Sequence, residues 1–427
     1  MKTYSLIIGL ALSLASCIGQ GPRLQNQVNL EKVVAENNLG ENHHWGLMLF
    51  DPQTGETVYS KNANMYFVPA SNVKILTLFA SLQVYGDSLP AMKYIQKGDS
   101  TVFWGLGGPG LFHPYLPDIN PFGKLKSGSN LFFSGVNFRE QKLGSGWSWD
   151  DYNDDYQVER GSLPVFGNIL KATQEKNYIS YTPNLSFFNS KTESEITEIK
   201  RDLNKNDFGL PVNFKKNQDV PFVTSDSLTL AILNKTLGTE IKRSSLVSEK
   251  NAEIIYGYKA DTVYRRMMQI SDNMLAEQLL LGTSSTFSDT LSTTHAIAYF
   301  QKNYLANTPQ KIKWVDGSGL SRYNLITPET LVYILNQLWQ KTDHDYLLSL
   351  LASSEAEGTL KNLYGNQKAA IFAKSGSMSG VYNQSGYMYT ATGRLLIFSV
   401  MNNNFTASVS QVRKATSKLI SELSSSL

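Results

Sequence analysis

The chain has 427 residues, 41% of them hydrophobic and 18% charged, and a formal net charge of +3. This length and composition suffice for a large core and for more than one domain. The small net charge and the lack of a Lys- or Arg-rich block disfavour a nucleic-acid-binding protein. The five histidines lack the spacing of a metal-binding helix, so we expect neither a metal nor another cofactor.

The N-terminal segment MKTYSLIIGLALSLASC has the features of an export signal. It begins with a basic residue, Lys2, and continues with an apolar stretch over 6–15 that is too short for a comfortable membrane span. Its last four residues resemble the lipobox of bacterial lipoproteins and end at Cys17, the single cysteine of the chain. We therefore predict a lipoprotein signal over 1–17 with a lipid on Cys17. An ordinary signal peptide cut nearby is the alternative.

The segment after Cys17 begins IGQGPRLQNQ, and we interpret residues 18–30 as a flexible tether. Ile18 is not an acidic residue of the kind that retains lipoproteins in the inner membrane. The prediction is an exported, periplasmic protein that is lipid-anchored to a membrane, with the outer membrane favoured.

The predicted secondary structure changes along the first half of the chain. A hairpin is predicted over 45–60, and a helix is predicted from Ala70 to Gly86. Residues 93–255 then hold short β-like runs broken by Gly, Pro and Asn, with little helical periodicity before Ser227. We interpret this part as an inserted, mostly β region of one or two modules.

Helical patterns return after the inserted region. Two amphipathic helices are expected on either side of a polar break at Ser271, and Thr327 with Pro328 predicts the start of another helix. A hairpin that turns at 392–393 and a helix over 406–423 follow. The predicted fold is therefore α+β: residues 31–92 and 256–427 form one domain, an antiparallel sheet from both chain ends flanked by helices.

One pair of residues in the first helix has the spacing of a nucleophile and its base. Ser71 and Lys74 form the single Ser-x-x-Lys of the chain, and this spacing places both side chains on one helix face. A serine hydroxyl needs a neighbouring base, and a buried lysine beside a second cation can serve. A helix-capping serine with a surface lysine is the competing interpretation of the pair alone.

Two further motifs favour the catalytic interpretation. Ser271-Asp272-Asn273 falls in the break between two helices, and Lys374-Ser375-Gly376 follows an apolar strand. Both patterns recur elsewhere, at 60–62 and at 126–128, but those copies lie in the wrong order along the chain. The order Ser-x-x-Lys, Ser-x-Asn, Lys-[Ser/Thr]-Gly is the signature of penicillin-binding proteins and serine β-lactamases.

With these motifs the chain resembles the D-alanyl-D-alanine carboxypeptidase/endopeptidase family of low-molecular-mass penicillin-binding proteins, the class with a large insertion in the transpeptidase domain. The resemblance covers nearly the whole mature chain and implies a serine β-lactamase/transpeptidase-like domain. Further stretches similar to the family are FWGLGGPGL (103–111), GWSWDDYNDDY (146–156), DGSGLSRYNLITP (316–328), EGTL (357–360) and KSGSMSGVYNQSGY (374–387). Two features depart from the family pattern: Ser375 replaces the usual Thr, and VERGSLPVFGN (158–168) replaces an Ala-Pro-x-Ser-Ala segment.

The resemblance implies a role for each motif residue. Ser71 would attack the carbonyl of the penultimate D-Ala and Lys74 would accept its proton. Ser271 would pass a proton to the leaving D-alanine, and Asn273 would orient the substrate amide and hold Lys74. Lys374 would bind the terminal carboxylate and lower the pKa of Lys74 through its like charge.

Substrate-binding roles are implied for five more residues. Ser375 and Gly376 complete the motif that binds the terminal carboxylate, and the backbone N–H of Ser377 would form an oxyanion hole with that of the nucleophile. Asp151 matches the position that holds the amino group of the third stem-peptide residue; a solvated loop acid is the alternative. Arg322 either lines the cleft or only ties its own loop to the core.

The implied partners are peptidoglycan stem peptides ending in D-Ala-D-Ala, and β-lactam antibiotics as covalent inhibitors. Two other functions stay open on the sequence alone. A serine β-lactamase is disfavoured because no Glu-x-x-Leu-Asn motif follows Ser271. A non-catalytic penicillin-sensing or wall-binding lipoprotein would need no nucleophile beside a base, although a sensor that acylates once would keep all three motifs. The balance between carboxypeptidase and endopeptidase activity also stays open.

Overall fold

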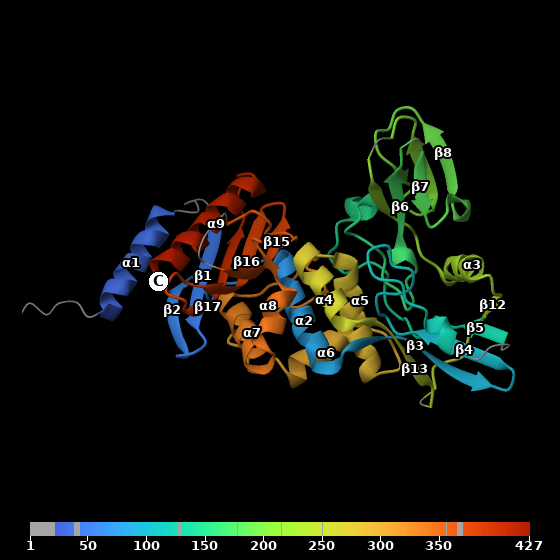
Figure 1. Cartoon of the computed structure of the whole chain (residues 1–427), viewed down its shortest axis with the longest axis horizontal. Coiled ribbons are helices and arrows are strands. Elements are labelled where there is room, and N and C mark those ends of the chain that lie inside the picture. The colour runs from blue at the N-terminus through green and yellow to red at the C-terminus, as the bar shows by residue number, and fades with distance from the viewer. Residues whose placement is uncertain are drawn as a thin grey trace, which may run out of the picture.

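The computed structural model describes residues 22–37, 43–125, 130–176, 178–214, 216–249, 251–355, 357–364 and 370–427. Within them, one six-stranded antiparallel sheet combines the two ends of the chain. Its strands, in their hydrogen-bonded order, are β14 (Ala352–Ser353), β15 (Ile371–Met378), β16 (Val381–Tyr389), β17 (Leu395–Asn403), β1 (His44–Asp51) and β2 (Glu56–Lys61). In Figure 1 the blue strands β1 and β2 lie beside the red and orange strands β15–β17.

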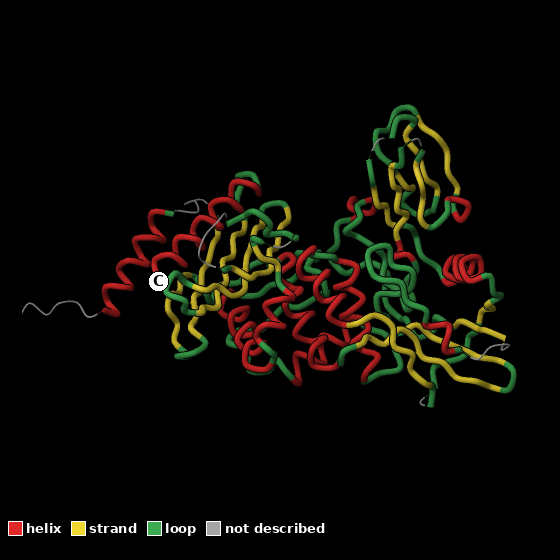
Figure 2. Tube along the Cα trace, viewed as in Figure 1, coloured by secondary structure: helices red, strands yellow, loops and turns green. Residues whose placement is uncertain are grey.

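Helices cover both faces of this sheet. One face packs on α7 (Pro328–Lys341) and the other on α9 (Val409–Ser426). The remaining helices of this domain extend from the α7 side toward the inserted region (Figure 2). They are α2 (Val73–Val84), α4 (Ala260–Arg265), α5 (Asn273–Thr283), α6 (Thr293–Asn303) and α8 (His344–Leu350). The predicted α+β arrangement is confirmed.

Alternation along the strands explains why the sheet is buried on both sides. In β17, Leu396, Phe398 and Val400 belong to the core beneath α9, whereas Ile397 and Met401 belong to the core beneath α7. Successive side chains of a strand point to opposite faces. A mostly apolar run therefore produces a central strand between two helical layers.

The N-terminal helix α1 (Pro22–Glu36) overturns part of one prediction. The expected flexible tether over 18–30 is helical from Pro22 onward. Leu30 and Val34 lie on one face of this helix and are buried in the core beneath α9. The hydroxyl of Tyr59 in β2 donates to Glu31 at 3.1 Å. Burial of the two apolar side chains is the reason that this segment is ordered.

The inserted region forms three small sheets. The largest has the order β12 (Ile241–Arg243), β5 (Asn130–Phe133), β4 (Ser100–Gly105), β3 (Ser88–Lys97), β13 (Glu253–Lys259). The other two are β11 (Gln218–Pro221), β6 (Ile169–Gln174), β7 (Ile179–Thr182) and β8 (Asn189–Glu193), β10 (Asp207–Pro211), β9 (Lys200–Arg201). A single longer helix, α3 (Asp226–Leu237), accompanies them among the described residues. The strands β6–β8 form a lobe that stands apart from β3–β5 (Figure 1).

The predicted boundaries of the insertion fall inside two paired strands. Residue 93 lies in β3 and residue 255 in β13, and these strands pair antiparallel. The inserted region therefore begins with β3 and ends with β13, because a hydrogen-bonded pair of strands closes it.

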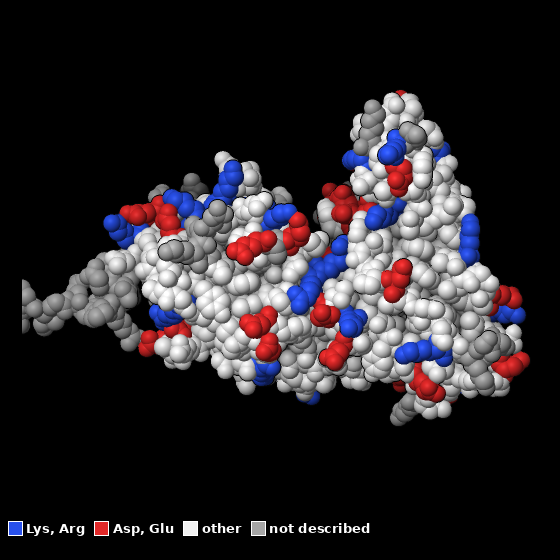
Figure 3. All heavy atoms as spheres, viewed as in Figure 1, with Lys and Arg blue, Asp and Glu red and all other residues white. Residues whose placement is uncertain are grey.

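Figure 3 shows a notch between this region and the domain with the large sheet, and basic and acidic side chains interspersed over the face shown.

One predicted helix start is confirmed and another lies slightly later in the chain. The hydroxyl of Thr327 accepts the backbone N–H of Thr330 and caps α7, with Pro328 in its first turn. The C-terminal helix begins at Val409, three residues later than predicted, because Ser408 and Gln411 form a capping box there.

The predicted signal and Cys17 lie outside the described residues. In the part of the chain that is described, no helix is both long and apolar enough to cross a membrane.

Candidate active site

Ser71 lies in a strained turn at the start of α2. Residues Ala70–Asn72 form a 3₁₀ turn that continues into the helix, and Ala70 has a φ of 46°. Such a conformation costs a non-glycine residue about 1–3 kcal/mol and persists only where the surroundings enforce it. Here Gly319 packs so closely that a Cβ on it would lie 1.9 Å from the Ala70 carbonyl oxygen. The loop around Gly319 thus holds the nucleophile in place.

Lys74 is buried and directed at Ser71. Its side chain is fully buried, and its Nζ donates to Ser71 Oγ at 3.0 Å, to Asn273 Oδ1 at 2.5 Å and to the Ser318 carbonyl oxygen at 2.8 Å. A capping serine with a surface lysine, the competing interpretation of this motif, is therefore wrong. The Lys74 ammonium thus has three acceptors. One of them is the Ser71 hydroxyl, which the neutral amine would deprotonate.

Burial sets the basicity of Lys74. Loss of hydration lowers its pKa to about 8, while the carboxylates of Asp316, Glu277 and Asp272 oppose the shift. At pH 7 an amine with this pKa is neutral in about a tenth of molecules, against roughly one in three thousand at a pKa of 10.5. Lys74 is thus suited to act as a general base near neutral pH.

Lys374 is a second buried lysine, coupled to Lys74 by like charge. Lys374 is fully buried, and burial together with the charge of Lys74 lowers the pKa of Lys374 well below its usual value. Burial is the largest cause of the lowered pKa of Lys74, and the carboxylates of Asp316, Glu277 and Asp272 oppose it. Repulsion between two like charges is mutual, so the predicted effect of Lys374 on Lys74 stays a prediction.

Ser271 is presented by an irregular break between two helices. A π-helical turn, Arg266–Ile270, precedes it, and Ser271 itself has a φ of 68°. The next residue, Asp272, caps α5 by accepting the N–H of Leu275 at 3.1 Å. The Ser271 hydroxyl accepts a hydrogen bond from Lys374 Nζ at 2.9 Å. The predicted polar break therefore places Ser271 against the lysine of the third motif.

The third motif lies inside β15 and packs against the nucleophile turn. A Cβ on Gly376 would lie 3.0 Å from the backbone nitrogens of Ser71 and Asn72. Ser375 is buried, while Ser377 is exposed at the end of the strand. The strand can approach the turn this closely because residue 376 has no side chain.

A cleft of about 510 Å³ collects these residues. It is lined by the nucleophile, by Ser271 and Asn273, by the 319–322 loop, by 377–379 and by the inserted segment that holds Gly146, Ser148, Asp151 and Tyr156. Arg322 lines the cleft and donates to the carbonyl oxygen of Ser379, an exposed residue, at 3.0 Å. Its position is therefore not confined to tying its own loop to the core.

Asp151 also faces this cleft. Burial raises the pKa of its carboxyl, and the neighbouring Asp150 and Asp154 raise it further. Arg322 opposes this increase. Asp151 thus lies in a region of accumulated negative charge, where a cationic group would be stabilised.

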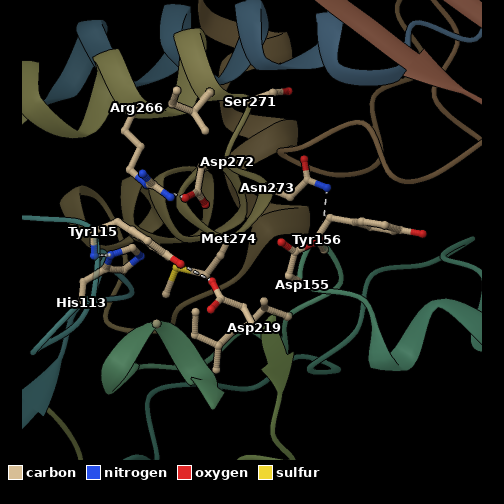
Figure 4. A pocket seen from close by; sticks show the side chains of 14 residues that line it. His113, Tyr115, Asp155, Tyr156, Asp219, Arg266, Ser271, Asp272, Asn273 and Met274 are labelled. Carbon is tan, nitrogen blue, oxygen red and sulfur yellow. Dashed lines mark hydrogen bonds and ion pairs between the residues drawn. The ribbon is translucent and has the colours of Figure 1, made fainter. Parts of the chain in front are cut away.

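A second hollow of about 190 Å³ adjoins the cleft beyond Asn273, whose amide donates to the Tyr156 carbonyl oxygen at 3.0 Å (Figure 4). Its polar side chains are largely paired with one another. Arg266 donates to Asp272 at 2.8 Å and lies over the ring of Tyr115. We interpret these pairs as the support of the Ser271 loop. Among the described residues no group of His, Cys, Asp and Glu side chains is arranged to hold a metal ion.

Sequence reasoning assigned no role to several residues that shape the site. They are Tyr156, Arg160, Glu277, Asp316 and Ser318. Glu277 was detectable, because it is the one charged residue in the apolar run MLAEQLLLG (274–282). Ser318 acts through its backbone carbonyl, for which side-chain chemistry offers no signal.

The sequence pattern of the D-Ala-D-Ala carboxypeptidase 3 (S13) family matches residues 26–91 and 260–423, more than half of the chain. The chain belongs to this family. The interruption in the S13 match coincides with the inserted region between the start of β3 and the end of β13. The family and the enzyme class that the three motifs predicted, a serine D-Ala-D-Ala carboxypeptidase, are confirmed.

Individual relatives agree with the S13 assignment. The chain is 24% identical to penicillin-sensitive carboxypeptidase A of Dictyostelium discoideum, over 84% of this chain and 83% of that protein. It is 21% identical to D-alanyl-D-alanine carboxypeptidase DacB of Haemophilus influenzae, over 86% and 87% of the two chains. The crystal structure of penicillin binding protein 4 (dacB) from Haemophilus influenzae superposes with a TM-score of 0.70 at 17% identity, covering 92% of this chain and 99% of that one. That likeness shows a shared fold.

Proposed function

We propose that the chain is a penicillin-sensitive serine D-Ala-D-Ala carboxypeptidase that cleaves peptidoglycan stem peptides through an acyl-enzyme on Ser71. The observation that carries this proposal is the hydrogen bond from Lys74 to the Ser71 hydroxyl, with Ser271, the partner of Lys374, lining the same cleft as Ser71. The name of the Dictyostelium relative supports sensitivity to penicillin, and the Haemophilus protein has been solved in complex with a β-lactam.

Acylation follows from the positions of the two hydroxyl–lysine pairs. Neutral Lys74 accepts the proton of Ser71 as its oxygen forms a bond to the carbonyl carbon of the penultimate D-Ala. Backbone N–H groups of Ser71 and Ser377 stabilise the negative oxygen. The C–N bond then breaks, and the leaving D-Ala nitrogen receives a proton through Ser271. Water subsequently hydrolyses the ester and restores the Ser71 hydroxyl.

Lys374 and Asp151 suit the two charged ends of such a substrate. The Lys374 ammonium, with Ser375 beside it, provides charge-assisted hydrogen bonds for the terminal carboxylate. Asp151 and Arg322 lie in the part of the cleft lined by the inserted region. We assign to Asp151 an amino group on the third residue of the stem peptide. A cross-linked peptide presents the same D-Ala carbonyl, so endopeptidase activity uses the same site.

We also propose that the protein is exported and held at a membrane, preferably the outer one, by a lipid on Cys17. Four residues separate Cys17 from the start of α1 at Pro22. In Figure 1 α1 lies at the end of the molecule opposite the inserted lobes, so an anchor there would direct those lobes away from the membrane. Mass spectrometry of the N-terminal peptide from the native host would show diacylglyceryl on Cys17, and an unmodified terminus elsewhere would contradict the anchor.

The function is tested by Ser71→Ala, with Ser60→Ala as a matched control. Ser60 is an exposed serine of the decoy motif 60–62 and lies in β2. The wild type and Ser60→Ala should bind fluorescent penicillin covalently and release D-alanine from a D-Ala-D-Ala peptide. Ser71→Ala should do neither, with a rate loss on the order of 10⁶-fold as for comparable nucleophiles. Rapid turnover of a chromogenic cephalosporin by the wild type would favour a β-lactamase. Labelling without D-alanine release would favour a penicillin sensor.

A further inference from the structure

Glu277 is a buried carboxylate that the reaction described above does not use. It lies in α5, is 1% exposed, and is surrounded on its helix by apolar residues. Burying a charge is costly unless it is paired and hydrogen-bonded. Its two oxygens have specific partners: Oε1 accepts the backbone N–H of Ser318 at 2.7 Å, and Oε2 lies 3.5 Å from Arg160 Nη1. These two contacts point in different directions, toward the base and toward the inserted region.

The Ser318 contact leads directly to Lys74. The Ser318 carbonyl oxygen accepts a hydrogen bond from Lys74 Nζ at 2.8 Å. Asp316 fixes the same loop from the other side, because its carboxylate accepts the N–H groups of Gly319 at 2.9 Å and Ser321 at 2.7 Å. Glu277 therefore holds Ser318 directly, and Asp316 holds Gly319 and Ser321 in the same loop.

The Arg160 contact leads to the inserted region. Arg160 is also buried, and it donates to the carbonyl oxygen of Gln141 at 3.0 Å and to the hydroxyl of Thr293 at 2.9 Å. The same nitrogen of Arg160, Nη1, also lies 3.7 Å from Glu140. Arg160 thus pairs with two glutamates, of which only Glu277 contacts the loop that holds Lys74.

From these contacts we propose that Glu277 is a positioning residue for Lys74, acting through Ser318, and that its pair with Arg160 couples the inserted region to the catalytic base. The inference rests on the proposed function, since it assumes that Lys74 is the base. Glu277 itself touches neither Ser71 nor the substrate-binding groups in the cleft.

The charges around Glu277 and Lys74 predict a specific pH dependence of the acylation rate. Burial and Asp316 raise the pKa of the Glu277 carboxyl to about 7, with Arg160 opposing. The Glu277 carboxylate in turn raises the pKa of Lys74, as do Asp316 and Asp272. Acylation is therefore fastest when two protons have left, one from Lys74 and one from Glu277, within a narrow range of pH.

Glu277→Gln separates this role from a merely structural one. The amide keeps the shape but removes the charge. The pKa of Lys74 should fall because an attractive carboxylate is lost, so the acid limb of the acylation rate should move to lower pH by roughly half a unit or more. The slope of that limb should fall from nearly two protons to one. The plateau rate should decrease roughly tenfold as the Ser318 carbonyl becomes less well fixed.

The matched control is Glu140→Gln, which removes the charge of the partly buried glutamate that pairs with the same arginine nitrogen. It should destabilise the protein without altering the position or slope of the acid limb. The readout is the rate of labelling by fluorescent penicillin between pH 5 and 9, with thermal unfolding of each variant recorded alongside.

The outcomes distinguish the two proposals. A wild type that is not labelled overturns the proposed function, and the inference falls with it. A labelled wild type with an acid limb of one proton overturns the inference alone, even where Glu277→Gln does not fold. An unchanged limb in Glu277→Gln, or an equal change in Glu140→Gln, also overturns it.

Discussion

The ammonium group of Lys374 donates a hydrogen bond to the Ser271 hydroxyl at 2.9 Å, although the two residues are 103 positions apart in the chain. A second pair joins Lys74 to Ser71 at 3.0 Å, and Asn273 accepts a hydrogen bond from Lys74. Ser71, Ser271 and Asn273 line the same cleft, while both lysines are fully buried. Each of the two buried lysines thus donates a hydrogen bond to one serine. We assign Ser71 as the nucleophile with Lys74 as its base, and Ser271 as the proton carrier beside Lys374.

Acylation should depend on pH through the neutral form of Lys74. Because burial lowers its pKa to about 8, the fraction able to accept a proton rises with pH and levels off above that value. Labelling by penicillin should therefore rise from pH 6 to a plateau above about pH 8. Lys74→Arg, which stays protonated, should lower the rate by about 10²–10⁴-fold and remove this limb. A wild-type rate that is constant from pH 6 to 9 would contradict Lys74 as the base.

Lys374 should recognise a terminal carboxylate. Lys374→Met removes the cation and should cost about 1.5–3 kcal/mol of binding in the transition state, roughly 10- to 150-fold in kcat/KM. A peptide ending in a D-Ala amide serves as the control substrate. The wild type should prefer the acid to the amide by this factor, and the variant should cleave both equally. A variant that keeps the preference would place the carboxylate elsewhere.

Asp151 should distinguish stem peptides by the charge of their third residue. Asp151→Asn should lower kcat/KM roughly fivefold for a peptide with a free amino group on that side chain, and should not affect an acetylated peptide. Asp150→Asn is the matched control, since Asp150 is its exposed neighbour outside the cleft lining. Equal effects of the two substitutions would show that only the general negative charge matters.

Gly319 should be required for the geometry of the nucleophile turn. Its φ is 87°, and a Cβ would lie 1.9 Å from the Ala70 carbonyl oxygen. Gly319→Ala should displace Ser71 and lower the acylation rate about 100-fold. Gly393→Ala has a similar φ of 81° but open space around it, so it should cost only about 1 kcal/mol of stability and leave acylation unchanged. Wild-type acylation by Gly319→Ala would show that the turn tolerates displacement.

Local chemistry made several elements predictable. Thr327 and Pro328 start α7 as expected because a cap and a first-turn proline act within a few residues. The break at Ser271 was readable because a polar Ser-Asp-Asn interrupts two apolar helical patterns. The α1 helix was missed because its order comes from burial of Leu30 and Val34 beneath a helix at the other end of the chain.

The sequence by itself determined the chemical groups of this protein: one Ser-x-x-Lys, two ordered companion motifs, and an insertion between them. Covalent spacing decides which residues share a helix face, and it placed Lys74 beside Ser71. Only the tertiary structure decided the basicity of Lys74, because its lowered pKa arises from complete burial, which three carboxylates from distant segments oppose. It also brought Glu277, Arg160 and the Ser318 carbonyl to the base, since hydration, charge and backbone contacts exist only once the chain has packed.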